Sequence, residues 1–309
     1  MKAVISIASV GILLSIACNT VVEPEAYYRN KILFTSSRSG IEQLYMMNPD
    51  GSDVRQITSG PYWHNNGRWS PDAKQIICNT EEGTATAGFM MAVMNPDGRN
   101  RQLLRWGSQM AWSPVGAKIL FTICLDCELG GRGIGLFIMD GDGGNVARLS
   151  IDGGAPEWSP HGDMIALVEP DTTNSLPPQP TIRLTDYPAL TSSNTIGPKG
   201  AVEPAWSPTG EQIAFSSLNE GYPVNGNPTE NIFIMNADGS NVTMVTDFRT
   251  GDQCSTPRWS PDGSEIIFLL HSTDASRPSH TMWSVRMDGT NLRKIGNDIT
   301  VRSADWSKN

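Results

Sequence analysis

The sequence contains few cysteines and histidines, and it lacks an excess of basic residues. Its 309 residues include five Cys and four His, and 32 Asp and Glu outnumber 23 Lys and Arg, for a formal net charge of -9. An acidic chain gains no attraction to a phosphate backbone, so we expect no nucleic-acid partner.

Long apolar runs are also missing, except at the start of the chain. Lys2 precedes an uncharged, mostly apolar run over residues 3–17, which is shorter than the roughly 20 residues that span a bilayer. A basic start followed by a short apolar run is typical of a signal peptide. We therefore expect a signal peptide at 1–17, a linker at 18–30 and a periplasmic protein.

Cys18 directly follows Ala17. The segment resembles the bacterial lipoprotein signal, in which this cysteine becomes the lipidated first residue and anchors the protein to the membrane. It departs from that signal at Ser15, where Leu is usual, so cleavage by ordinary signal peptidase stays an alternative.

Export would place the remaining cysteines in an oxidising compartment. Cys124 and Cys127 form a C-x-x-C pair, which fits a loop disulfide, a redox pair or half a zinc site. No second C-x-x-C and no thioredoxin-like pattern accompany the pair. We predict a disulfide between them, and free thiols at Cys78 and Cys254.

An internal repeat dominates the sequence. Trp-Ser-Pro begins at Trp69, Trp112, Trp158, Trp206 and Trp259, and an altered copy begins at Trp306, with spacings of 43, 46, 48, 53 and 47 residues. A second phrase, of the type Asn-Pro-Asp-Gly at residues 48–51, follows in five of the six units; the unit around residues 185–190 lacks it. A period of 40–50 residues is typical of propeller blades.

Both phrases predict tight turns. Pro fixes φ, Asp bonds its own backbone and Gly supplies a positive φ. Runs rich in Ile, Val, Phe and Met between the turns, such as residues 232–235, predict short strands. Four strands per unit predict an all-β, six-bladed β-propeller of four-stranded antiparallel blades over residues 31–309, with the tryptophans packed between blades.

The two ends of the repeat array are complementary. The unit that starts at Lys31 lacks a Trp-Ser strand, and Trp306-Ser307 has no following strand. We expect these two segments to pair in one blade and to close the ring, which would remove an open sheet edge.

The repeated phrases resemble those of the TolB-like, WD-like β-propellers of bacterial envelopes. The resemblance covers nearly all of the chain after the linker and implies the propeller fold and the binding of an envelope protein partner at the propeller mouth. Only about a dozen residues separate Cys18 from the first expected strand, so we expect TolB's preceding α/β domain to be missing.

The long connections are expected to share one face of the propeller, because strand direction alternates within a blade. Loops on a rigid scaffold commonly carry binding sites. The residues that precede each tryptophan lie near the axis of this face, and we predict the binding residues there: His64, Asn65, Arg68, Gln109, Glu157, Glu203, Arg258, Arg302 and Asp305.

Patterns that would indicate catalysis are few. No G-x-S-x-G nucleophile motif occurs, and we expect no enzyme activity, no catalytic residues, no metal and no cofactor. The alternative is a glycan-binding propeller or a metal-dependent glycan-cleaving one. It would use His64, His271 and His280 as ligands, or Tyr62, Trp63 and Trp106 as stacking surfaces.

Metabolic labelling with a fatty acid tests the expected anchor. The protein should incorporate label, and Cys18→Ser should abolish the incorporation. Unlabelled protein whose free N-terminus lies beyond Cys18 would contradict the prediction.

Overall fold

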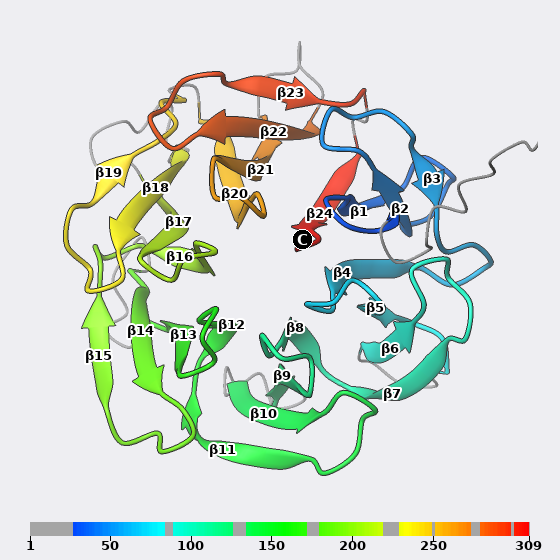
Figure 1. The fold of residues 1–309 in the computed structure, drawn as a ribbon, viewed down its shortest axis with the longest axis horizontal. Helices are drawn as coiled ribbons and strands as arrows, with labels where there is room; N and C mark the ends of the chain where they lie inside the picture. The colour runs from blue at the N-terminus through cyan, green and yellow to red at the C-terminus, as the bar shows by residue number, and fades with distance from the viewer. Residues whose placement is uncertain are drawn as a thin grey trace, which may run out of the picture.

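Antiparallel strands follow one another around a central axis (Figure 1), and the chain is an all-β β-propeller. The computed structural model describes residues 27–83, 89–125, 134–171, 179–218, 229–248, 251–272, 279–297 and 300–308. The expected signal peptide and Cys18 lie outside the described residues. Within the described part, no helix has the length and apolar character that a membrane crossing needs.

Four sheets have four strands each, written here from the innermost strand outward. They are β24(Val301–Trp306), β1(Ile32–Ser36), β2(Gln43–Met47), β3(Arg55–Gln56); β4(His64–Trp69), β5(Ile76–Thr80), β6(Met90–Met94), β7(Gln102–Trp106); β8(Ser108–Trp112), β9(Lys118–Cys124), β10(Ile134–Asp140), β11(Ala147–Asp152); and β12(Gly154–Trp158), β13(Met164–Glu169), β14(Thr181–Asp186), β15(Ser193–Ile196).

The remaining sheet differs from the expected arrangement of six separate four-stranded blades. It contains eight strands: β16(Val202–Trp206), β17(Gln212–Leu218), β18(Glu230–Asn236), β19(Thr243–Met244), β20(Gln253–Trp259), β21(Glu265–His271), β22(His280–Arg286) and β23(Arg293–Ile295). One parallel residue pair, Glu230 with Gln253, joins β18 to β20. This bridge merges two units that the repeat length had predicted to be separate sheets.

The last strand pairs with the first. β24 runs antiparallel to β1, with Ile32 opposite Trp306 and Phe34 opposite Ala304. The Trp306 indole N–H donates to Asn30 Oδ1 at 2.8 Å, and the Ser307 N–H donates to the Lys31 carbonyl at 2.9 Å. Segments at opposite ends of the chain therefore form one sheet.

The repeated tryptophans pack between neighbouring sheets, as predicted. Trp69 is 5% exposed and lies in a cluster with Leu33 and Leu44 of the preceding sheet. Trp306 is 7% exposed and packs with Phe34 of its own sheet and with Met282 of β22. These contacts bury one side of each sheet against the next.

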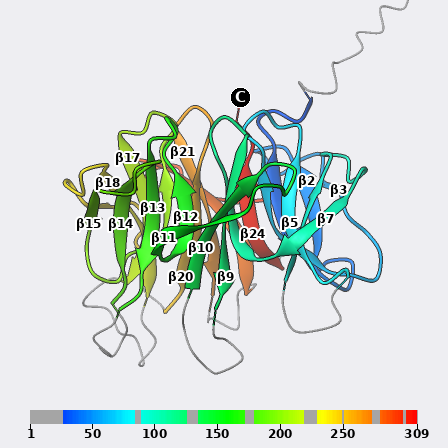
Figure 2. The ribbon, with the colours of Figure 1, turned by 90° about the horizontal axis from the view of Figure 1, so that it is seen from below.

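The turn phrases also form as predicted. In the turn after Trp69, the Asp72 carboxylate accepts the backbone N–H of Lys74 at 3.1 Å, and Asp50 accepts that of Ser52 in the same way at 2.9 Å. These turns lie at one end of the strands, the turn face, together with the C-terminus (Figure 2). The connections between second and third strands lie at the opposite end, the loop face.

The tryptophan packing predicts a large stability difference between two substitutions. Trp306→Ala should lower the free energy of unfolding by about 3–5 kcal/mol, because it leaves a cavity between sheets. Trp106→Ala is the matched control, since Trp106 is 38% exposed, and it should cost about 1 kcal/mol or less. Urea denaturation measures both, and equal losses would contradict the packing assignment.

Candidate functional site

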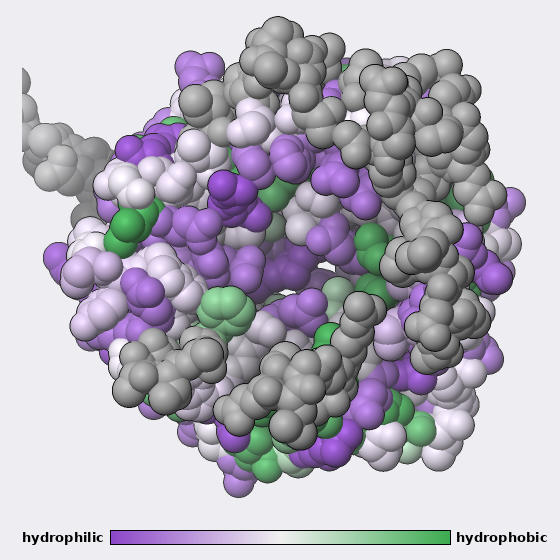
Figure 3. All heavy atoms as spheres, turned by 180° about the vertical axis from the view of Figure 1, so that it is seen from behind, coloured by the Kyte–Doolittle hydropathy of each residue, from purple (hydrophilic) through white to green (hydrophobic). Residues whose placement is uncertain are grey.

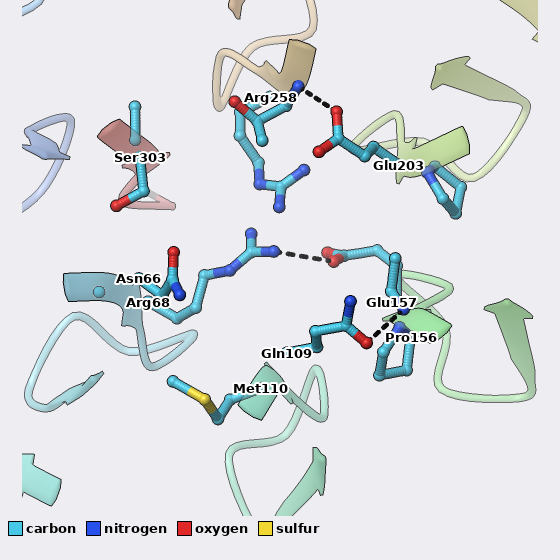
Figure 4. A pocket seen from close by; sticks show the side chains of 14 residues that line it. Asn66, Arg68, Gln109, Met110, Pro156, Glu157, Glu203, Arg258 and Ser303 are labelled. Atoms are coloured by element: carbon cyan, nitrogen blue, oxygen red, sulfur yellow. Dashed lines mark hydrogen bonds and ion pairs between the residues drawn. The ribbon is translucent and has the colours of Figure 1, made fainter. Parts of the chain in front are cut away.

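The innermost strands surround an axial cavity of about 220 Å³ that opens to solvent. Each of the strands β4, β8, β12, β16, β20 and β24 contributes to it. Its lining residues are Asn66, Gly67, Arg68, Gln109, Met110, Ala155, Pro156, Glu157, Glu203, Pro204, Thr256, Arg258, Ser303 and Ala304. We call this cavity the channel; Figure 4 shows the side chains that point into it.

A β-bulge recurs at one position of the innermost strands. The pairing with the second strand shifts register before the tryptophan in β4, β8, β12, β16 and β20. The residue three before the tryptophan has a positive φ in all five, at 51°, 51°, 44°, 54° and 49° for Asn66, Gln109, Ala155, Glu203 and Thr256. A bulge redirects side chains and is frequent beside functional sites.

The bulges connect neighbouring strands around the channel. Glu203 Oε2 accepts the backbone N–H of Thr256 at 2.6 Å, and Gln109 Oε1 accepts that of Ala155 at 3.0 Å. A side chain at the bulge of one innermost strand therefore binds the backbone at the bulge of the next. These bonds offset part of the strain of the left-handed residues.

A cluster of opposite charges occupies the channel. The Asp305 carboxylate lies 3.5 Å from Arg68 Nη1 and 3.6 Å from Arg258 Nε, and it accepts the backbone N–H of Trp69 at 2.8 Å. Arg68 Nη2 lies 3.9 Å from Glu157 Oε2. Figure 4 shows the ends of the Arg68 and Arg258 side chains approaching each other from two different innermost strands, β4 and β20.

Burial acts against the charges of this cluster. It raises the pKa of the Asp305 carboxyl, although Arg68 and Arg258 act in the opposite direction. It also lowers the pKa of the Arg258 guanidinium, and the like charge of Arg68 adds to that effect. The charges of Asp305 and Arg258 therefore depend on the opposite charges around them to offset burial, so removing one partner would leave a charge buried without compensation.

Six of the nine predicted binding residues surround the channel. Arg68, Gln109, Glu157, Glu203 and Arg258 line the cavity itself, and Asp305 lines the spaces toward the turn face. Their role in binding stays a prediction.

The other three predicted residues do not line the channel. Asn65 and Arg302 both lie beside Glu42: Asn65 Nδ2 donates to Glu42 Oε2 at 2.8 Å, and Arg302 Nε lies 3.9 Å from Glu42 Oε1. His64 is 1% exposed, and its Nε2 lies 3.2 Å from Arg101 Nη1. The first position of β4 is therefore buried, which the pattern of residues before the tryptophan did not indicate.

The three histidines of the alternative metal site do not converge. His271 and His280 stack with ring centroids 4.4 Å apart, whereas His64 contacts Arg101. Among the described residues, no three His, Cys, Asp or Glu side chains form a group that could hold a metal.

The cysteines take two forms in the structure. Cys78 and Cys254 are free and buried, and burial raises the pKa of the Cys78 thiol to about 12. Cys124 is disulfide-bonded. Its predicted partner Cys127 lies outside the described residues, so the pairing stays a prediction.

Two further cavities adjoin the channel. One of about 550 Å³ opens beside β11, β12 and β13, and its walls include Asp152, Val168, Glu169 and Arg183. Another, of about 330 Å³, lies toward the turn face among the prolines of the Trp-Ser-Pro phrases. The channel thus opens toward both faces.

The bulge residues Asn66, Ala155 and Thr256 escaped the sequence reasoning, which concentrated on charges and amides. A signal existed for Ala155 and Thr256. Pro occurs two residues before the tryptophan at Pro156, Pro204 and Pro257, in strands that otherwise pair on one side. A proline there marks a bulge or an unpaired position.

A β-propeller with a charged axial channel is the class of protein that this fold and site define. No family model matches the chain. Over 118 residues it is 31% identical to the uncharacterized peptidase YuxL of Bacillus subtilis; the match covers 37% of this chain and only 17% of that protein.

Solved structures give a wider likeness. The chain is similar to TolB from Acinetobacter baumannii, with a TM-score of 0.70 and 18% identity over 91% of this chain and 67% of that one. It is also similar to an oligogalacturonate lyase in complex with manganese, with a TM-score of 0.56 and 15% identity over 87% and 74%. At these identities the likeness shows a shared, TolB-like propeller fold.

The expectation that the chain is not an enzyme is contradicted by these comparisons. The relative matched in sequence over 118 residues is named a peptidase, and this match points toward an enzymatic function. The missing G-x-S-x-G motif excludes one way of presenting a nucleophilic serine and no other chemistry.

The buried His64 predicts a pH-dependent stability. Burial and the Arg101 charge lower its pKa to about 4, below the roughly 6.5 of an unfolded chain. Protons therefore favour the unfolded state, and stability should fall as pH drops from about 6.5 toward 4. Between pH 8 and pH 5 the contribution is about 2 kcal/mol.

His64→Gln removes this titration. Between pH 8 and pH 5 the free energy of unfolding of the wild type should therefore fall by about 2 kcal/mol more than that of His64→Gln. His161→Gln, at an exposed turn position, is the control. Urea denaturation at both pH values decides, and parallel losses in all three proteins would contradict the assignment.

Proposed function

We propose that the chain is an exported envelope scaffold that binds a protein partner through the loop face of a TolB-like propeller. The observation that carries this proposal is the mixed charge of the channel, where Arg68 and Arg258 face Glu157, Glu203 and Asp305. A channel lined by positive and negative side chains suits the mixed surface of a protein. A polyanion would require a continuous basic lining.

The architecture behind this function is a six-bladed, WD-like propeller closed by β24. The eight-stranded sheet divides into two four-stranded units at the single bridge between Glu230 and Gln253. The pairing of β24 with β1 supports closure. We infer six units because each innermost strand ends in one of the six repeated tryptophans.

The proposed location is the periplasm, with lipid attached at Cys18. Tyr27, the first described residue, donates its hydroxyl to Asp53 Oδ2 at 2.7 Å, and the Tyr28 carbonyl accepts the Ser307 hydroxyl at 2.8 Å. Both contacts lie at the turn face. A tether that leaves from this face would keep the loop face available to a partner.

A second candidate is an enzyme that acts on a polypeptide held at the same mouth. The sequence match to a protein named a peptidase favours it. The glycan-binding or glycan-cleaving alternative stays a prediction, because the similarity to the lyase at 15% identity shows the fold alone.

Site-specific photocrosslinking in the native envelope tests the proposal. A photoreactive phenylalanine at Tyr62 or Ile134, which are 41% and 38% exposed on the loop face, should crosslink to a defined protein. The same group at Val115, 83% exposed on the turn face, should not. The crosslinked protein, once purified, should bind the wild type and lose at least tenfold in affinity for Glu203→Gln, whose side chain lines both the channel and the cavity beside β12 and β13.

Three outcomes would reject the scaffold. They are crosslinking from Val115 alone, crosslinks to glycan alone, and cleavage of the captured polypeptide in step with its binding. The last outcome would favour the second candidate, and mass spectrometry of the captured chain distinguishes it from simple capture.

A further inference from the structure

The channel brings charges of both signs together inside the ring. From the loop face, the central hollow is surrounded by hydrophilic side chains (Figure 3). The six innermost strands that form its wall all belong to the described part of the chain. Five of their charged side chains enter the wall or the spaces below it, namely Arg68, Glu157, Glu203, Arg258 and Asp305.

Two arginines direct hydrogen-bond donors into this wall that their contacts with described residues do not use. A guanidinium has five N–H donors. Arg258 Nη1 donates to the Pro257 carbonyl at 2.6 Å, whereas its Nε is buried without a hydrogen bond. Arg68 Nη1 donates to Asp305 at 3.5 Å. Their side chains are 11% and 21% exposed, so an acceptor inside the channel would satisfy donors that water reaches only in part.

Two glutamates bring unused acceptors to the same space. The contact of Glu157 with Arg68 Nη2, at 3.9 Å, is an ion pair too long for a hydrogen bond. The contacts of Glu203 involve Oε2, which accepts from the Thr256 N–H at 2.6 Å and from the Ser216 hydroxyl at 3.3 Å. Each carboxylate therefore keeps at least one oxygen for a donor in the channel.

The rest of the wall is small and mostly apolar. Gly67 and Ala155 have little or no side chain, and Met110, Pro156 and Pro204 complete the lining. The volume of about 220 Å³ is below the roughly 300–1,000 Å³ of pockets for drug-sized ligands. The channel therefore suits a small ligand with a short apolar part.

Opposite charges are adjacent in this space. Figure 4 shows the charged ends of Arg68, Glu157, Glu203 and Arg258 directed into the channel from four different strands. A ligand of one sign would meet like charge: an anion would meet the glutamates, and a simple amine would meet the arginines. An α-amino acid carries a carboxylate and an ammonium group on one carbon atom, so both signs lie close together and each finds its opposite.

We propose that the channel binds a free α-amino acid with a small apolar side chain, its carboxylate on Arg68 and Arg258 and its ammonium group on Glu157 and Glu203. A planar guanidinium matches a carboxylate through two parallel N–H···O bonds. An ammonium group has three donors for the glutamate oxygens. This binding goes beyond the proposed function, because a free amino acid requires no protein partner at the loop face.

The other charged groups near the channel agree with this assignment. Asp305 is held by the Trp69 N–H at 2.8 Å, and Lys308 lines the cavities toward the turn face. Burial raises the pKa of Glu230, and the negative charge of Glu203 raises it further. An ammonium group on Glu203 would offset the negative field that Glu230 meets.

Isothermal titration calorimetry on the purified, dialysed protein tests the proposal with ligands that share one side chain. L-alanine should bind. N-acetyl-L-alanine, which has no ammonium group, and L-alanine amide, which has no carboxylate, should each bind at least about tenfold more weakly. The dipeptide alanylalanine, whose charges lie further apart, should also bind more weakly than L-alanine.

Substitutions then assign the site. Arg68→Gln and Glu157→Gln should each weaken the binding of L-alanine at least about tenfold, because each removes one partner of the ligand. Arg68→Gln/Glu157→Gln keeps the net charge of the wall and should lose binding as well. Arg148→Gln is the matched control, since Arg148 is 51% exposed and paired with Asp152 outside the channel; it should leave the affinity unchanged.

Four outcomes would overturn the proposal: no measurable binding of L-alanine, equal affinity for its two blocked forms, tighter binding of the dipeptide, or equal affinities of folded Arg68→Gln and Arg148→Gln. Urea denaturation shows whether each variant is folded, and where one is not, the ligand series on the wild type decides.

The calorimetric assay contains no partner protein, so its failure leaves the proposed scaffold standing. Photocrosslinking from Tyr62 and Ile134 that captures no protein would reject the scaffold and leave the amino-acid site standing.

Discussion

The tryptophan that ends each innermost strand is packed between two neighbouring sheets, and the position of the channel groups depends on this packing. Side chains alternate along a strand, so a tryptophan that points into one interface places the preceding residue on the opposite face of its sheet, from where Arg68, Glu157 and Arg258 reach the channel. Arg68, Glu157, Arg258 and Asp305 all occupy that preceding position. The interaction that joins the sheets therefore also sets the depth at which the charges of the channel meet.

The recurrent bulge adds a second residue of each strand, the one three before the tryptophan, to the wall of the channel. Without the bulge, this residue would have ordinary extended backbone and would pair fully with the second strand. Its side chain would then lie on the same face as that of the residue directly before the tryptophan. The bulge instead places Gln109 and Glu203 in left-handed backbone, where they bind Ala155 and Thr256 of the next innermost strand. The firmly packed sheets sustain this strain, and the channel gains a rigid polar wall.

The same scaffold supports different functions, because a propeller brings side chains from many strands to one axis and fixes no chemistry there. The likeness to TolB, to a peptidase and to a lyase is understandable in these terms. What distinguishes this chain lies in particular groups. Its channel is mixed in charge, and on the loop face outside the channel Arg302 contacts His280. Function has to be argued from those sites.

The repeats by themselves determined the strands, the turns, the packing of the tryptophans and the pairing of β24 with β1, because turn chemistry and alternation act over a few residues. Tertiary structure alone decided the rest. It merged two units at Glu230 and Gln253, buried His64 beside Arg101, and brought Arg302 to His280. These contacts depend on the distance between adjoining sheets of the ring. The spacing of the repeats along the chain does not specify that distance.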